Sequence, residues 1–158
     1  MRSRKAGFSL VELVVVIVII GILAAIAIPR LSRGSQAASQ SALAMNLATV
    51  RNAVSIYAAE HNSTWPGPDA DGFATKLTTA TNINGGVPGA NERKYGPYLL
   101  AIPVCPIGTK AGEGTVKVVT GATPVPDDTT AWMYNADTGE FLANTAATDD
   151  TGKAYKLY

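Results

Sequence analysis

The sequence predicts an α+β fold in which a long amino-terminal helix, membrane-spanning in its first half, packs on a small antiparallel β-sheet head. Residues 8–28 form an aliphatic run, which would make a helix roughly 31 Å long, against about 30 Å for the hydrocarbon core of a bilayer. Farther along, apolar residues recur at helical spacing between 43 and 57. The last third contains short β-branched and aromatic runs that are separated by turn residues.

Composition limits the class of protein. The chain has 158 residues, of which 47% are hydrophobic and 16% are charged, as expected for one domain with an added apolar segment. Lysines and arginines number 13 against 12 acidic residues. The chain therefore lacks a broad positive field, and we expect no nucleic-acid partner. The single cysteine, Cys105, excludes a disulfide within the chain and is expected to be a small buried hydrophobe.

The amino terminus fits two ordinary targeting segments. Arg2, Arg4 and Lys5 precede the apolar run, as in a secretory signal peptide that would be cleaved before Ile28. The same basic residues would instead hold the amino terminus of a single-span anchor in the cytoplasm. Neither interpretation explains the carboxylate of Glu12 near the start of the run.

Glu12 needs a partner, because an ionised carboxylate in the hydrocarbon costs about 2.5 kcal/mol or more. The sequence has no lysine, arginine or histidine between Lys5 and Arg30. Cleavage between Gly7 and Phe8 would create an amine close to Glu12 in the same chain, and this amine could also meet the Glu12 of a neighbouring chain. In the alternative, Glu12 lies at headgroup depth and is solvated.

Residues 5–13, KAGFSLVEL, with the aliphatic run that follows, resemble the class III leader of type IV pilins and type II secretion pseudopilins. The resemblance implies that residues 1–7 are a leader, which a prepilin peptidase removes by cutting after Gly7. It implies that the new amine of Phe8 is then methylated. It also implies that Glu12 pairs with the methylated amine of an adjacent subunit during filament assembly.

The first helix is expected to cross the membrane over 8–28 and to continue as an amphipathic helix over 29–61. Pro29 lacks an amide hydrogen and should kink the helix, and the resemblance implies that the segment from Gly21 to Pro29 melts during assembly. His61, at the helix end, is expected to interact with the helix dipole or with solvent. One face of the continuation carries an apolar stripe that should pack on the head: Leu43, Leu47, Val50, Val54 and Tyr57.

The head, residues 62–158, begins with a long stretch rich in glycine, proline and asparagine. Two parts of this stretch, 96–99 and 102–108, resemble more loosely the major type II pseudopilin, although Cys105 and Ile107 replace its aspartate and tryptophan. The predicted elements of the head are a helix at 73–79, strands at 115–120, 132–134, 140–144 and 155–158, and a turn at 137–139.

The sequence contains no recognisable catalytic or phosphate-binding motif, so we expect a structural subunit rather than an enzyme. The resemblance implies polymerisation through the amino-terminal helix into a type IV pilus-like or type II secretion filament. Its partners would be copies of itself, the prepilin peptidase and the assembly platform of the inner membrane. The amino terminus would start in the cytoplasm, and the head would lie in the periplasm and then in a periplasmic or extracellular filament. The alternative is a membrane-tethered periplasmic binding domain or enzyme with a pilin-like leader.

Calcium is the one candidate cofactor. Major pseudopilins, which the chain resembles, carry a calcium site in the loops of the head, and carboxylates are ligands that calcium prefers. In the alternative, the loop carboxylates of this chain are solvated surface groups. The candidate ligands are four aspartates: Asp127, Asp128, Asp149 and Asp150.

Overall fold

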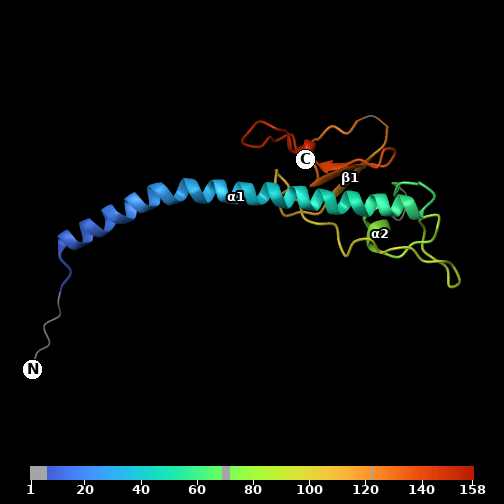
Figure 1. Cartoon of the computed structure of the whole chain (residues 1–158), viewed down its shortest axis with the longest axis horizontal. Coiled ribbons are helices and arrows are strands. Elements are labelled where there is room, and N and C mark those ends of the chain that lie inside the picture. The colour runs from blue at the N-terminus through green and yellow to red at the C-terminus, as the bar shows by residue number, and fades with distance from the viewer. Residues whose placement is uncertain (1–6, 69–71, 122) are drawn as a thin grey trace, which may run out of the picture. The chain divides into compact units, whose positions relative to one another are not determined.

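The computed structural model describes residues 7–68, 72–121 and 123–158 (Figure 1). Residues 1–6 of the predicted leader therefore lie outside the described residues. The chain divides into two compact units, Met1–Ala38 and Ser39–Tyr158.

The described residues form two helices, three strands and a 3-10 turn. In chain order these are α1 (Leu10–Glu60), α2 (Phe73–Thr78), β1 (Val116–Val119), β2 (Trp132–Asn135), β3 (Phe141–Ala143) and η1 (Tyr155–Leu157). The strands make one sheet in the order β1-β2-β3. The predicted long helix, the short helix and the first three predicted strands are confirmed, with each end within two residues of its predicted position.

The first unit contains the apolar beginning of α1. The helix begins at Leu10 and continues through Pro29 without a break. Its large apolar side chains are exposed from Leu10 to Leu31, and an 18-residue window of α1 has a mean hydropathy of 3.2. By length and composition, α1 can therefore cross a membrane.

In the second unit, the predicted stripe of α1 is buried, with each of its five side chains at most 2% exposed. These side chains share one core cluster with Trp132, Tyr134 and Phe141 of the sheet. Arg51 adds a polar connection, because its guanidinium donates from Nε to the carbonyl of Phe141 at 3.0 Å and from Nη1 to the carbonyl of Tyr158 at 2.9 Å. The expected α+β fold, a long helix packed on a small sheet, is confirmed.

The sheet is mixed, which differs from the antiparallel sheet expected from the sequence. β2 and β3 are antiparallel, but β1 runs parallel to β2, with Val116 opposite Trp132 and Val119 opposite Asn135. Alternation of side chains identifies a strand and its two faces, but it does not give the direction of the neighbouring strand. The connection over residues 120–131 is long enough to return the chain to the same end of the sheet, as a parallel pair requires.

The expectation of a strand at 155–158 is wrong. Tyr155–Leu157 form the 3-10 turn η1, in which the amide of Leu157 donates to the carbonyl of Ala154 at 3.0 Å. The only extended pairing in this segment of the described chain is an isolated antiparallel bridge between Thr148 and Ala154. Tyr155 is buried in the core cluster, so packing of its ring favours the turn over an exposed edge strand.

His61 lies in the core, so of its two expected interactions, with the helix dipole or with solvent, the one with solvent is wrong. It is 1% exposed, and its ring stacks on that of Tyr57 with the centroids 3.8 Å apart. Its Nδ1 lies 2.8 Å from the carbonyl of Tyr57 and its Nε2 lies 3.0 Å from Oγ1 of Thr81. Cys105, in contrast, is buried as expected.

Candidate functional site

The predicted cleavage and assembly residues lie at the start of α1. Gly7, Phe8 and Ser9 precede the helix and are exposed. Apart from its two chain neighbours, no described residue has an atom within 4 Å of the position where a side chain on Gly7 would begin. The backbone around the Gly7–Phe8 bond is therefore outside the helix and uncrowded in this unit.

Ser9 and Glu12 form a reciprocal cap at the first turn. The amide of Ser9 donates to Oε2 of Glu12 at 2.9 Å, and the amide of Val11 donates to Oγ of Ser9 at 3.3 Å. This is a variant of the capping box in which the serine accepts from the second helical amide and not from the third, and it satisfies amides that have no partner inside the helix. Because Ser9 follows Phe8 directly, the Glu12 carboxylate is held beside the backbone on which a cleaved chain would carry its amine.

The sequence carries a local signal for this cap. A serine followed three residues later by a glutamate, just before an apolar run, is typical of a helix amino terminus. The cap gives Glu12 a second role, in the start of the helix, in addition to the predicted pairing between subunits.

The structure leaves the predicted helix melting between Gly21 and Pro29 as a prediction. Both residues lie within a continuous helix, and apart from the neighbouring residues and the adjacent helix backbone, no described atom lies within 4 Å of the missing Cβ of Gly21. Pro29 removes one hydrogen bond from this segment, so the helix is locally weakened without being interrupted.

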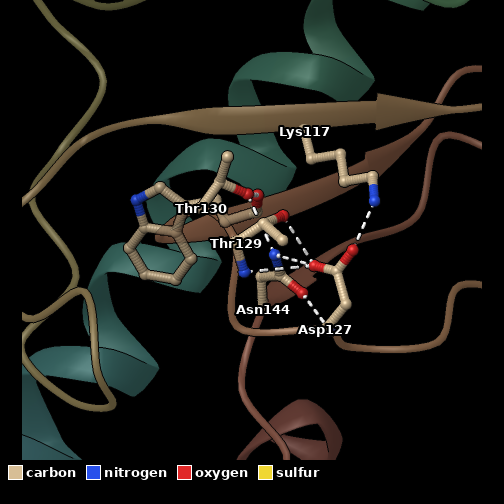
Figure 2. Close-up of polar contacts among 6 residues, drawn as sticks. Lys117, Asp127, Thr129, Thr130 and Asn144 are labelled. Atoms are coloured by element: carbon tan, nitrogen blue, oxygen red, sulfur yellow. Dashed lines mark hydrogen bonds and ion pairs between the residues drawn. The ribbon is translucent and has the colours of Figure 1, made fainter.

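In the second unit, Asp127 is the centre of a polar network, which we call the Asp127 network. Its Oδ1 accepts from the amide of Thr129 at 3.2 Å, from Oγ1 of Thr129 at 2.7 Å and from Nδ2 of Asn144 at 2.8 Å. Its Oδ2 accepts from the ammonium of Lys117. Figure 2 shows Lys117 and Asn144 approaching the carboxylate from different sides. The hydrogen bond from Lys117, with those from Asn144 and Thr129, lowers the pKa of Asp127 well below its usual range.

Asp149 is the centre of a second, separate set of hydrogen bonds. Its Oδ1 accepts from the amide and hydroxyl of Thr151 at 2.8 and 2.7 Å and from the amide of Lys153 at 2.9 Å. Its Oδ2 accepts from the hydroxyl of Tyr158 at 2.6 Å. These bonds, that from Tyr158 first, lower the pKa of Asp149, and the same contact raises the pKa of Tyr158 to about 12.

The other two predicted calcium ligands have one weak contact each. Oδ1 of Asp128 accepts from the hydroxyl of Thr109 at 3.3 Å, and Oδ1 of Asp150 accepts from Nε2 of Gln40 at 3.4 Å. Among the described residues, no group of three or more histidine, cysteine, aspartate or glutamate side chains is arranged to hold a metal ion. The four aspartates therefore do not converge on one site.

Sequence reasoning missed Lys117 and Asn144, which complete the Asp127 network. Lys117 lies ten positions before Asp127 and Asn144 lies 17 positions after it, so no local pattern connects them. The parallel pairing of β1 with β2, which the sequence did not predict, determines which side chains lie beside this loop.

Comparison with known proteins agrees with the geometry at the start of α1. Residues 2–28 match the family model described as the prokaryotic N-terminal methylation motif. The chain is 30% identical over 123 residues to type II secretion system core protein G of Vibrio cholerae serotype O1, covering 74% of this chain and 80% of that protein.

A second relative is type II secretion system core protein G of Aeromonas hydrophila, which is 32% identical over 110 residues and covers 68% of this chain and 71% of that protein. No solved structure matches the chain. These relatives extend the similarity well beyond the amino-terminal motif and into the head. The chain therefore belongs to the family of type II secretion system core protein G, within the pilins and pseudopilins that its amino-terminal segment resembles.

Proposed function

We propose that this chain is a membrane-anchored structural subunit that polymerises through the first part of α1 into the pseudopilus of a type II secretion system. The observation that carries the proposal is the methylation motif over residues 2–28, in which Glu12 is the one acidic residue and the helical part is apolar and exposed. An apolar helix with one carboxylate fits a membrane before assembly and the interior of a filament after it.

Membrane topology follows from the charges around the apolar run. Arg2, Arg4 and Lys5 precede it, so the amino terminus stays in the cytoplasm and the head is exported to the periplasm. The type II secretion relatives support a secretion pseudopilus over a surface pilus. They are named as core proteins of a secretion system, which supports a structural role over that of a tethered enzyme or binding domain.

Processing occurs at the Gly7–Phe8 bond. A prepilin peptidase cuts after Gly7, and the freed amine of Phe8 is then methylated. The exposed, non-helical backbone at residues 7–9 supports this assignment, because a peptidase must reach both sides of the bond it cuts. Glycine also allows close approach, since it has no side chain.

Assembly depends on Glu12. The carboxylate pairs with the amine of Phe8 on a neighbouring subunit, because a charge buried among apolar helices needs a counter-charge. Breaking such a pair by removing one partner costs about 3–5 kcal/mol. Incoming subunits that lack the carboxylate are therefore excluded from the filament.

Mass spectrometry of the mature protein from membranes tests the processing step. We expect an amino-terminal Phe8 that carries one methyl group. An amino terminus at Ile28 would instead identify an ordinary signal peptide, and the assembly proposal would then be wrong because the apolar segment would be absent from the mature chain.

Co-expression of variants with wild-type subunits tests the assembly step. Processed Glu12→Leu protein should accumulate in the inner membrane while wild-type filaments form. Glu12→Gln is the matched variant, because its amide oxygen can still accept from Ser9 although the charge is lost. We expect it to be excluded as well, and normal incorporation of Glu12→Gln would rule out charge pairing as the basis of assembly.

A further inference from the structure

We infer that the ammonium of Lys117 takes the place of a divalent cation at Asp127. An ion pair within the chain then holds the connection between β1 and β2, and the head does not require calcium. This inference concerns the stability of the second unit and does not depend on filament formation.

The oxygens of Asp127 are already used by the chain. A calcium ion takes six to eight oxygen ligands and needs carboxylate oxygens that face an open position. Both oxygens of Asp127 accept hydrogen bonds, from Lys117 on one side and from Thr129 and Asn144 on the other. A cation that bound here would compete with these donors and would bring two positive charges close together.

The position of Lys117 is set by the sheet. It lies in the middle of β1, where Met133 of β2 is its register partner. Its side chain is 41% exposed and that of Asp127 is 34% exposed, so the pair lies at the surface, where an ion from solution could reach it. The ammonium therefore competes with solvent cations at an accessible carboxylate, and it does so at the high effective concentration of a group in the same chain.

The network holds the connection between the two parallel strands. Asn144 lies directly after β3. Its Oδ1 accepts a hydrogen bond from the amide of Asp127 at 2.8 Å, and its Nδ2 donates to Oγ1 of Thr130 at 2.9 Å. The hydroxyl of Thr130 donates to the carbonyl of Trp132 in β2 at 2.8 Å. The connection, β1 and the end of β3 are thus joined through one carboxylate (Figure 2), which is the structural task that a calcium ion would perform in a loop.

Asp149 offers no replacement site. The groups that hydrogen-bond to its carboxylate are donors of its own loop and of Tyr158. The ammonium of Lys153 also lies 4.1 Å from the ring centre of Tyr158, so positive charge is again present beside the loop. Both carboxylates that the structure holds in place are therefore already bound by donors of the chain itself.

The first experiment measures the melting temperature of the head in the full-length protein in detergent, with calcium and with the chelator EGTA. A ligand that binds only the folded state raises the melting temperature. We expect the same temperature in both solutions. A higher melting temperature in millimolar calcium than in EGTA would overturn the inference.

The second experiment compares two lysines. Lys117→Met removes the ammonium from Asp127, whereas Lys110→Met removes it from an exposed pair with Glu113 at 3.4 Å that takes no part in the network. Lys117→Met should melt about 2–4 °C lower than wild type, and Lys110→Met should melt at the wild-type temperature. Equal melting temperatures of the two variants would show that Lys117 does not hold the connection between β1 and β2, and the inference would be wrong.

Discussion

The two units of the chain contain parts of the same helix, yet they use it in opposite ways. In the first unit, the apolar side chains of α1 are exposed from Leu10 to Leu31. In the second, the stripe from Leu43 to Tyr57 is buried, and it shares one core cluster with residues of the head. Helix propensity alone does not distinguish these segments. The two segments differ in the surroundings that their apolar side chains suit. Those of the first unit suit lipid or neighbouring helices, and those of the second suit the protein's own core.

This comparison also separates the polar groups of the two units. In the first unit, the Glu12 carboxylate satisfies one backbone amide at the helix start. In the second, Asp127 and Asp149 each accept several hydrogen bonds and hold whole loops. Loss of a polar group should therefore act locally in the first unit and on the whole fold in the second.

The largest expected difference in stability is between two leucines of α1, one in each unit. Leu47→Ala leaves a cavity in the core cluster and should lower the free energy of unfolding of the head by about 2–5 kcal/mol. Leu23→Ala removes the same atoms from a side chain that is 61% exposed and should leave the melting temperature of the head unchanged. Thermal unfolding of both full-length variants in detergent measures this, and similar losses in the two would contradict the division between the units.

Acid should weaken the second unit through its aspartates. The pKa values of Asp127 and Asp149 are lowered in the folded chain by hydrogen bonds, from Lys117 and from Tyr158 respectively. Their contribution to stability is therefore complete above the unfolded-state pKa of about 3.9 and is lost as the pH falls toward the lower folded-state value.

Melting temperatures between pH 6 and pH 2 measure this effect. We expect a progressive fall that begins near pH 4 to 5, and a shallower fall in Asp127→Asn, which lacks one of the titrating groups. An equal slope in that variant would mean that Asp127 does not contribute to acid sensitivity.

The smallest effect is expected at the start of α1. Ser9→Ala removes the cap from the first turn, at a cost of about 0.5–2 kcal/mol in local helix stability. Amide hydrogen exchange of Val11 should become several-fold faster, while the head melts at the wild-type temperature. Ser9→Thr keeps a hydroxyl acceptor and serves as the control. Exchange at the wild-type rate in Ser9→Ala would show that the cap contributes nothing to the helix start.

The features that could be predicted from the sequence are those that depend on a pattern of neighbouring residues. The apolar run, the stripe from Leu43 to Tyr57 and the turn that ends at Gly139, where φ is 74°, are all readable over a few residues. The motif around Gly7, Phe8 and Glu12 is local as well. Ser9 could have been found by the same kind of reasoning, since the capping pattern spans only four residues.

The features of the fold and of the site that could not be predicted depend on residues that are distant from one another in the sequence. The parallel direction of β1 is decided by how its connection returns, and the burial of His61 depends on Thr81, which lies 20 positions later. The same holds for the Asp127 network, in which Lys117 and Asn144 come from opposite sides of β2 in the chain. The resemblance to major pseudopilins suggested calcium at the aspartates, but only the fold shows which donors hydrogen-bond to their oxygens.

The two hydrogen bonds of Arg51 have a consequence for the order of events during synthesis. They join residues 90 and 107 positions apart, and at about 5–20 residues per second the ribosome makes Phe141 roughly 5–20 seconds after Arg51. Throughout this interval the apolar stripe of α1 is not yet covered by the sheet. Folding of the head waits for contacts between residues that are far apart in the sequence, and such contacts form slowly. The apolar run of the first unit is complete before any strand of the sheet exists, so the anchor is available for insertion into the membrane before the head can close.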